Sequence, residues 1–116
     1  YFIHLPGEES FAFAGLWDRW EGTEVDAFSS YAVITKEAHE SIGFIHHRMP
    51  VILPERHWGT WLDASASIEK VSTALKDALR GFENRTVSDL VNDVKNEGPE
   101  LVKTLKRESQ KSFDFL

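Results

Sequence analysis

The sequence contains no cysteine, which excludes disulfide frameworks, thiolate metal sites and a thiol nucleophile carried by these residues. It has only 7 glycines and 4 prolines, so collagen-like and low-complexity classes are excluded as well. No apolar run approaches the roughly 18 residues that cross a bilayer, and the opening residues lack the pattern of a secretory signal. We therefore expect a cytoplasmic protein with no membrane partner.

Positive charge is scarce, because 13 lysines and arginines stand against 19 acidic residues and give a net charge of −6. This is the wrong sign for holding a polyanion by bulk electrostatics, so any contact with nucleic acid must be local. The length of 116 residues and the 41% hydrophobic content fit one globular domain. The chain opens with Tyr1 rather than methionine, inside a predicted strand, so we expect a fragment or a processed product.

Hydrophobic patterning predicts an α+β domain with antiparallel strands. Strands are expected at residues 1–5, 11–17, 28–35 and 49–53, the first two joined as a hairpin, with an acidic loop at 18–26. Thr35 is a candidate N-cap for a helix that ends near His46. The remaining expectations are a helix beginning at Pro54, an amphipathic helix from Ser67 to Gly81, strand-like pieces at 86–88 and 90–91, a turn at 96–99, and an exposed helix or tail at 100–111.

The densest group of reactive side chains is the segment IHHRMP at residues 45–50. Imidazole exchanges protons near neutral pH, so one histidine could act as acid or base while Arg48 clamps an anion. Alternatively, His46 and His47 favour the negative end of a helix dipole and Arg48 pairs with a carboxylate, which spacing alone favours. Adjacent side chains point in different directions on a helix or strand, so at most one of these histidines should face a site.

Two other groups have alternative interpretations. The five histidines show no short ligand spacing, so no metal site is predicted. The four tryptophans could stack on bases beside arginines or pack in the core, and the spacing of Trp58 and Trp61 on one helical face favours the core. The residues concerned are Trp17, Trp20, Trp58, Trp61, Arg19 and Arg56.

Four segments in order resemble the SRAP family, the SOS-response-associated peptidase or abasic-site-processing proteins. They are FAFAGLWDRW at 11–20, YAVITKEA at 31–38, IHHRMPVIL at 45–53 and VSDLVNDVKNEGPEL at 87–101, of which the H-x-R-M-P element is the most specific. The resemblance implies that residues 1–116 are the C-terminal portion of a single SRAP domain whose N-terminal half, with the catalytic cysteine, is absent. It also implies a mostly antiparallel β-barrel-like fold with peripheral helices.

The family motif carries three residues over to this sequence. His46 matches the active-site histidine, Thr35 falls where the family lines its DNA groove, and Arg48 is a candidate for DNA binding or structural pairing. His47 occupies the variable position, commonly Asp. The family's site Asn and Glu precede these residues, and Asp18 is an ordinary loop acid rather than that Glu.

The resemblance implies a chemistry for the complete protein. It binds single-stranded DNA at an abasic site, its N-terminal amine condenses with the ring-opened aldehyde, and the thiol closes a thiazolidine cross-link. The same cysteine is exposed by self-cleavage of the initiator methionine, hence the peptidase name. No cofactor is implied, and a bacterial member would be nucleoid-associated. His46 would exchange protons with the deoxyribose oxygen.

These residues alone lack the cysteine, the Asn and the Glu, so they should be inactive by themselves. A non-catalytic SRAP-like binding remnant is therefore one alternative, and a metal-dependent hydrolase using the histidines is another. Half a barrel exposes strand edges and apolar faces. We therefore expect the missing N-terminal half, or a second copy of this half, as a partner; the oligomeric state stays open.

Overall fold

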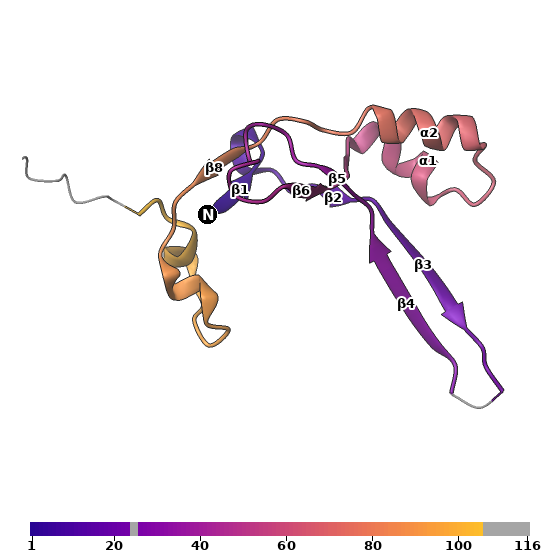
Figure 1. Ribbon diagram of the computed structural model, residues 1–116, viewed down its shortest axis with the longest axis horizontal. Helices are drawn as coiled ribbons and strands as arrows, with labels where there is room; N and C mark the ends of the chain where they lie inside the picture. The colour runs from indigo at the N-terminus through magenta and orange to yellow at the C-terminus, as the bar shows by residue number, and fades with distance from the viewer. Residues whose placement is uncertain (24–25, 106–116) are drawn as a thin grey trace, which may run out of the picture.

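The computed structural model describes residues 1–23 and 26–105. It is an α+β structure with few helices and short antiparallel strand pairs, as the sequence predicts (Figure 1). Within the described ranges the strands form four separate pairs and close no barrel. The radius of gyration is 20.0 Å, whereas a compact domain of this length has about 13 Å. The described part of the chain is therefore open rather than closed around one core.

The strands are short, and three times a single residue separates one strand from the next along the chain. They are β1 (Phe2–His4), β2 (Ala12–Phe13), β3 (Gly15–Trp20), β4 (Phe28–Val33), β5 (Thr35–Glu37), β6 (Arg48–Pro50), β7 (Ile52–Leu53) and β8 (Glu83–Arg85). The helices are α1 (Trp58–Leu62) and α2 (Ile68–Lys76), with 3-10 turns at η1 (Pro6–Glu8), η2 (Glu55–His57), η3 (Asp89–Asn92) and η4 (Pro99–Val102). No described helix is long and apolar enough to cross a membrane.

Three bent strands cross at a ring of backbone hydrogen bonds. Ala14 donates to the carbonyl of Val51 at 2.8 Å, Val51 donates to Ile34 at 2.8 Å, and Ile34 donates back to Ala14 at 2.9 Å. From this ring the pairs β2–β7, β3–β4 and β5–β6 leave in three directions, because each strand changes its partner at the crossing residue. The predicted strand 11–17 is thus divided at Ala14, which is wholly buried.

The pair β3–β4 projects from the body as a long hairpin (Figure 1). Its register joins Gly15 to Val33 at the base and Trp20 to Phe28 near the tip. The strand at 28–33 agrees with the sequence prediction. The acidic loop, however, begins only at Glu21, because residues 18–20 continue β3.

The predicted hairpin between 1–5 and 11–17 is wrong. The partner of β1 is β8, with Phe2 opposite Arg85, and the Arg85 guanidinium lies 4.8 Å from the centre of the Phe2 ring. The predicted strand-like pieces at 86–88 and 90–91 are also wrong, because the strand lies at 83–85. Ser88 instead caps η3, accepting from the backbone N–H of Leu90.

The predicted helix from Thr35 to His46 is likewise wrong. Thr35 begins β5, which pairs with β6, and the backbone N–H of Ala38 donates to His47 at 2.9 Å to extend the ladder. Residues 40–45 form a turn. The apolar spacing that suggested a helix arises because Ile42 and Ile45 reach the same core as Met49 from a turn.

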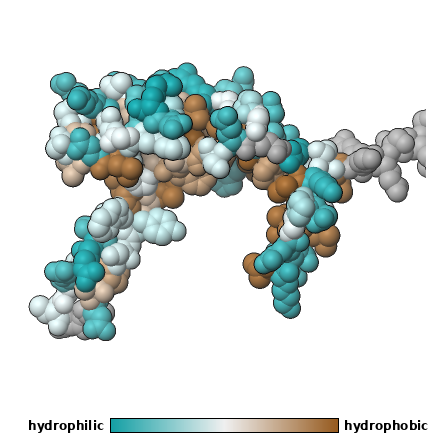
Figure 2. Space-filling view, turned by 180° about the vertical axis from the view of Figure 1, so that it is seen from behind, coloured by the Kyte–Doolittle hydropathy of each residue, from teal (hydrophilic) through white to brown (hydrophobic). Residues whose placement is uncertain are grey.

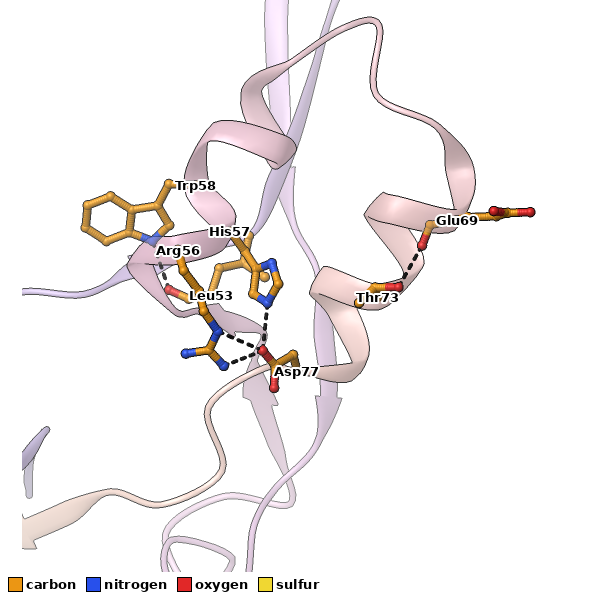
Figure 3. Close-up of polar contacts among 7 residues, drawn as sticks. All are labelled: Leu53, Arg56, His57, Trp58, Glu69, Thr73 and Asp77. Atoms are coloured by element: carbon orange, nitrogen blue, oxygen red, sulfur yellow. Dashed lines mark hydrogen bonds and ion pairs between the residues drawn. The ribbon is translucent and has the colours of Figure 1, made fainter.

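The helical segment after β7 largely agrees with the sequence. Ser67 caps α2 by accepting from the backbone N–H of Lys70, and Trp58 and Trp61 are half-buried against the core as predicted. The expected end of the helix at Gly81 is wrong, because α2 ends at Lys76. Asp77 there accepts hydrogen bonds from the side chains that precede α1 (Figure 3).

Two small hydrophobic clusters hold the body together. One gathers at the strand crossing under α1 and α2, and the other lies between the 40–45 turn and the chain that follows α2. The first contains Ala14, Val51, Leu53, Ala74 and Ala78, and the second contains Ile42, Met49, Ile52 and Phe82. The members of both clusters are 0–7% exposed, although no large side chain among the described residues falls below 2% exposure.

The C-terminal part forms a second projection. Gly98, at a φ of +118°, sits in the predicted turn at 96–99 and leads into η4. The predicted helix or tail at 100–111 is seen only as this short 3-10 turn and the residues to 105, and its remainder lies outside the described residues.

Candidate functional site

The candidate site lies on the exposed face of the β5–β6 pair. In the register of this pair Thr35 faces Pro50 and Glu37 faces Arg48, so these four side chains share one face. Met49 points to the opposite face, where it is 2% exposed in the core. The Arg48 Nη2 donates to the Thr35 hydroxyl at 3.0 Å. The buried methionine thus anchors the strand that presents the arginine.

His46 enters this face from the 40–45 turn. The turn is held by the backbone N–H of His39, which contacts the Met49 sulfur at 3.4 Å, and by Asn84, which donates to the Ser41 carbonyl at 3.3 Å. The backbone N–H of His46 donates to the carbonyl of Ile42 at 3.3 Å, and Ile42 is buried. The position of His46 therefore depends on core contacts and not on a helix.

The His46 ring is bound at one nitrogen. Its Nδ1 lies 3.0 Å from the backbone N–H nitrogen of Arg48 and 3.1 Å from the backbone carbonyl oxygen of the same residue. A ring with its proton on Nε2 accepts from the N–H at Nδ1, and a ring with a proton on Nδ1 donates to the carbonyl. Both states are satisfied at Nδ1, which leaves Nε2 for proton exchange.

His47 stacks on His46. The ring centres are 4.5 Å apart and the ring planes differ by 18°. The prediction that adjacent histidines would point in different directions is wrong, because residues 46 and 47 are neither helical nor extended in a strand. The expected helix dipole is absent here for the same reason, so that interpretation of the two histidines does not hold.

The structure brings the three predicted site residues together. His46, Arg48 and Thr35 form one hydrogen-bonded chain, through the Arg48 backbone at one end and its guanidinium at the other. Sequence reasoning missed Glu37, whose carboxylate shares the face opposite Arg48. The strand register was the signal that could have found it, and the predicted helix concealed that register.

A second polar cluster lies away from this face, at the end of α2 (Figure 3). The Asp77 carboxylate accepts from His57 Nε2 at 2.7 Å and from the Arg56 guanidinium. The hydrogen bond from His57, and then that from Arg56, holds the pKa of Asp77 below its ordinary value. Arg56 is therefore engaged in a structural contact, and it does not stand free to bind a base or a phosphate.

The remaining candidates fall outside the site. Trp17 and Trp20 lie on the projecting hairpin and are exposed, so the core interpretation does not hold for them in this structure. Asp18 lies on the same hairpin and accepts from the backbone N–H of Arg19 at 2.7 Å. Across residues 1–23 and 26–105, no three histidine or acidic side chains gather closely enough to hold a metal ion.

Comparison with known proteins shows which family the chain resembles. The model of the family SRAP, SOS response associated peptidase, matches residues 1–94. "Abasic site processing protein YoqW" of Bacillus subtilis is 34% identical over 104 residues, which are 88% of this chain and 46% of YoqW. "Abasic site processing protein HMCES" of Pongo abelii is 43% identical over 94 residues, which are 75% of this chain and 25% of that protein.

A solved structure supports the fold. The crystal structure of a protein from Bacteroides thetaiotaomicron superposes with a TM-score of 0.67 at 22% identity, covering 90% of this chain and 47% of that one. The chain thus spans about half the length of YoqW and of this structure. The family match and the YoqW identity together show that the chain belongs to the SRAP family.

Proposed function

We propose that residues 1–116 are the C-terminal portion of a single SRAP domain that processes abasic sites in single-stranded DNA. The domain would be barrel-like when complete, and its catalytic cysteine would come from the N-terminal half. The observation that carries this proposal is the hydrogen-bonded chain from His46 through Arg48 to Thr35. This chain supports the proposal because an imidazole and a guanidinium lie on one exposed face.

The proposed reaction joins DNA to protein through an N-terminal cysteine outside this chain. The ring-opened abasic sugar presents an aldehyde, and the cysteine amine condenses with it and releases water. The thiol then adds across the resulting C=N bond, and its proton moves to the nitrogen, which closes a thiazolidine. The same cysteine would be released by self-cleavage of the initiator methionine, which is the proposed peptidase activity, and no cofactor is needed.

His46 would supply proton transfer in this reaction. Opening of the sugar ring requires a proton on the ring oxygen and removal of one from the hydroxyl at the anomeric carbon. The Nε2 of His46 is available for both, because Nδ1 is held by the Arg48 backbone in either charge state. Arg48 would hold a neighbouring phosphate with the donors that Thr35 leaves free.

Charge supports local rather than global DNA contact. The chain carries a net charge of −6, and Glu37 shares the face of Arg48. The proposed N-terminal half would therefore provide most of the phosphate contacts. Its DNA substrate would place the protein in the cytoplasm and, in a bacterium, at the nucleoid.

The test uses the complete domain with His46→Ala. We expect the adduct to abasic single-stranded DNA to form and to reverse at least about tenfold more slowly. The reason is that general acid–base catalysis typically accelerates a reaction by about a hundredfold or more. His39→Ala is the matched control, because that imidazole serves only the 40–45 turn. Unchanged rates of formation and reversal in His46→Ala would reject the role of His46.

A second candidate is a non-catalytic SRAP-like binding remnant, which the absence of cysteine favours. The two candidates differ in what the natural protein carries ahead of these residues. Intact mass and N-terminal sequencing of the product made by its source would separate them. A product with an N-terminal cysteine ahead of these residues supports the cross-linker, and a mature product that starts near Tyr1 supports the remnant.

A further inference from the structure

The hairpin β3–β4 exposes aromatic side chains on both of its faces. Cross-strand partners share a face, so Trp17 and Tyr31 lie on one side and Trp20 and Phe28 on the other. Their exposed fractions are 75% for Trp17, 81% for Tyr31, 56% for Trp20 and 51% for Phe28. A two-stranded hairpin in water is marginal in stability, and large exposed apolar surface marks a site of contact. Both faces of this hairpin therefore need a cover.

The body also exposes apolar surface. Two hollows, of about 190 Å³ and 200 Å³, open on either side of Phe13, and both are lined almost entirely by apolar side chains. The first is walled by Leu53, Trp58 and Trp61, and the second by Met49 and Phe82 among others. Figure 2 shows apolar side chains gathered on the underside of the body, between its two projections. Apolar surface is thus exposed on the body as well as on the hairpin.

The negative charge of the hairpin favours a polypeptide over a nucleic acid as the molecule that covers it. Arg19 is the single cation in residues 15–33, and its guanidinium is paired with Glu21 at 3.1 Å. Asp18 and Asp26 add further negative charge to the same hairpin. Stacking proteins for single strands combine aromatics with a positive groove, which this acidic hairpin does not offer. A polypeptide with basic side chains around an apolar centre fits it better.

We infer that both faces of β3–β4, together with the hollows beside Phe13, are the surface that receives the rest of a SRAP domain. The occupant is a polypeptide equivalent to the part of YoqW that this chain does not match, since the match covers 46% of YoqW. The inference rests on the proposal that these residues are one portion of a larger SRAP domain. It adds that the occupant encloses the hairpin from two sides and carries lysine or arginine opposite Asp18 and Asp26.

The test compares the 116-residue chain with a chimera in which it replaces the matched 104 residues of YoqW. Amide hydrogen exchange reports local opening at each strand. We expect exchange at 15–20 and 28–33 to be at least about tenfold slower in the chimera than in the chain alone. Equal exchange in the two proteins would overturn the inference.

Variants test the two faces separately. Trp17→Lys alters one face and Trp20→Lys the other, and each should return hairpin exchange most of the way to that of the chain alone. Val94→Lys is the control, because Val94 is 95% exposed and lies outside the proposed surface. Protection that survives either tryptophan variant would remove that face from the contact. Since both tryptophans are exposed, circular dichroism of each variant should match the parent.

Other occupants give distinct outcomes. Concentration-dependent dimerisation of the chain alone, broken by Trp17→Lys, would replace the inferred occupant by a second copy. Slower hairpin exchange on adding a single-stranded oligonucleotide to the chimera would replace it by DNA. Adduct formation on abasic DNA is read on the same samples. A protected hairpin without an adduct rejects the proposed chemistry alone, and an adduct with an unprotected hairpin rejects the surface alone.

Discussion

His57 Nε2 lies 2.7 Å from the Asp77 Oδ2, so the side chain that closes α2 is bound to the segment that precedes α1. Arg56 donates to the same oxygen. The pair α1 and α2 packs on the strand crossing, and Trp61 Nε1 also donates to the Gly15 carbonyl at 3.0 Å. The Asp77 contact therefore fixes the direction in which the chain leaves the helices.

Asp77→Asn should lower the melting temperature of the chain by a few degrees at neutral pH. His57 and Arg56 lower the pKa of Asp77 from its ordinary 3.8. A lowered carboxyl pKa means that the unfolded chain binds the proton more readily, so the contribution is complete above about pH 4 and is lost as the pH falls through the folded-state pKa. Asp77→Asn should therefore remove part of the acid sensitivity below pH 4.

Thermal unfolding followed by circular dichroism across acid and neutral pH checks this expectation. Asp26→Asn is the control, because Asp26 is an exposed aspartate in the hairpin loop. A melting temperature of Asp77→Asn equal to that of the parent at neutral pH would show that the contact contributes nothing to stability.

Ala14→Val should destabilise the chain by about 1–3 kcal/mol, the usual cost of overpacking a filled site. Ala14 is wholly buried, and both its N–H and its carbonyl belong to the hydrogen-bond ring at the strand crossing. Two added methyl groups have no space without moving Val51 or Ile34. Ala32→Val is the control on the exposed hairpin, where the change should stay within about 0.5 kcal/mol. Urea unfolding with equal m-values measures the free energy of unfolding of both variants. Equal losses of stability would refute the idea that Ala14 occupies a site too tightly packed for a larger side chain.

Local patterns in the sequence predicted the elements that local forces determine. The aromatic and β-branched run at 28–33 forms β4, and Ser67 caps α2 where the helical spacing begins. The pairing of β1 was not predictable in this way, since β8 lies about 80 residues further along the chain. The end of α2 was missed because Asp77 is held by tertiary contacts.

In the candidate site, too, the sequence predicted some features, whereas others depend on tertiary contacts. The family resemblance led to the prediction of His46, Arg48 and Thr35 as site residues, which stays a prediction, whereas the residue spacing favoured a helix at 36–46 that is not there. A turn brings Ile42 to the core at the same spacing as a helix would, so periodicity alone does not distinguish the two. The stack of His46 on His47 follows from irregular backbone and has no signature in the sequence.

The proposed binding of single-stranded DNA predicts that Thr35→Val and Arg48→Gln weaken this binding by the complete domain in different ways. Thr35→Val removes the acceptor for the Arg48 guanidinium but keeps the charge, so affinity should fall about threefold to tenfold with an unchanged salt slope. Arg48→Gln removes one phosphate contact, so the slope of log K against log salt should fall by about 0.7.

Fluorescence anisotropy titrations at several salt concentrations separate the two effects. Thr35→Ser retains the hydroxyl and should bind as the parent does. A salt slope that Arg48→Gln leaves unchanged would mean that Arg48 positions His46 without touching phosphate.

The neutral His46 ring should carry its proton on Nε2. The backbone N–H nitrogen of Arg48 lies 3.0 Å from Nδ1, slightly closer than the Arg48 carbonyl oxygen at 3.1 Å, which favours Nδ1 as the acceptor. Nitrogen-15 NMR of the imidazoles at a pH where they are neutral should show the Nε2–H form for His46. His47 is the internal comparison, since its ring is held by stacking, which does not select a tautomer, and it should show a mixture. A mixed or Nδ1–H form at His46 would mean that Nδ1, and not Nε2, exchanges protons at this face.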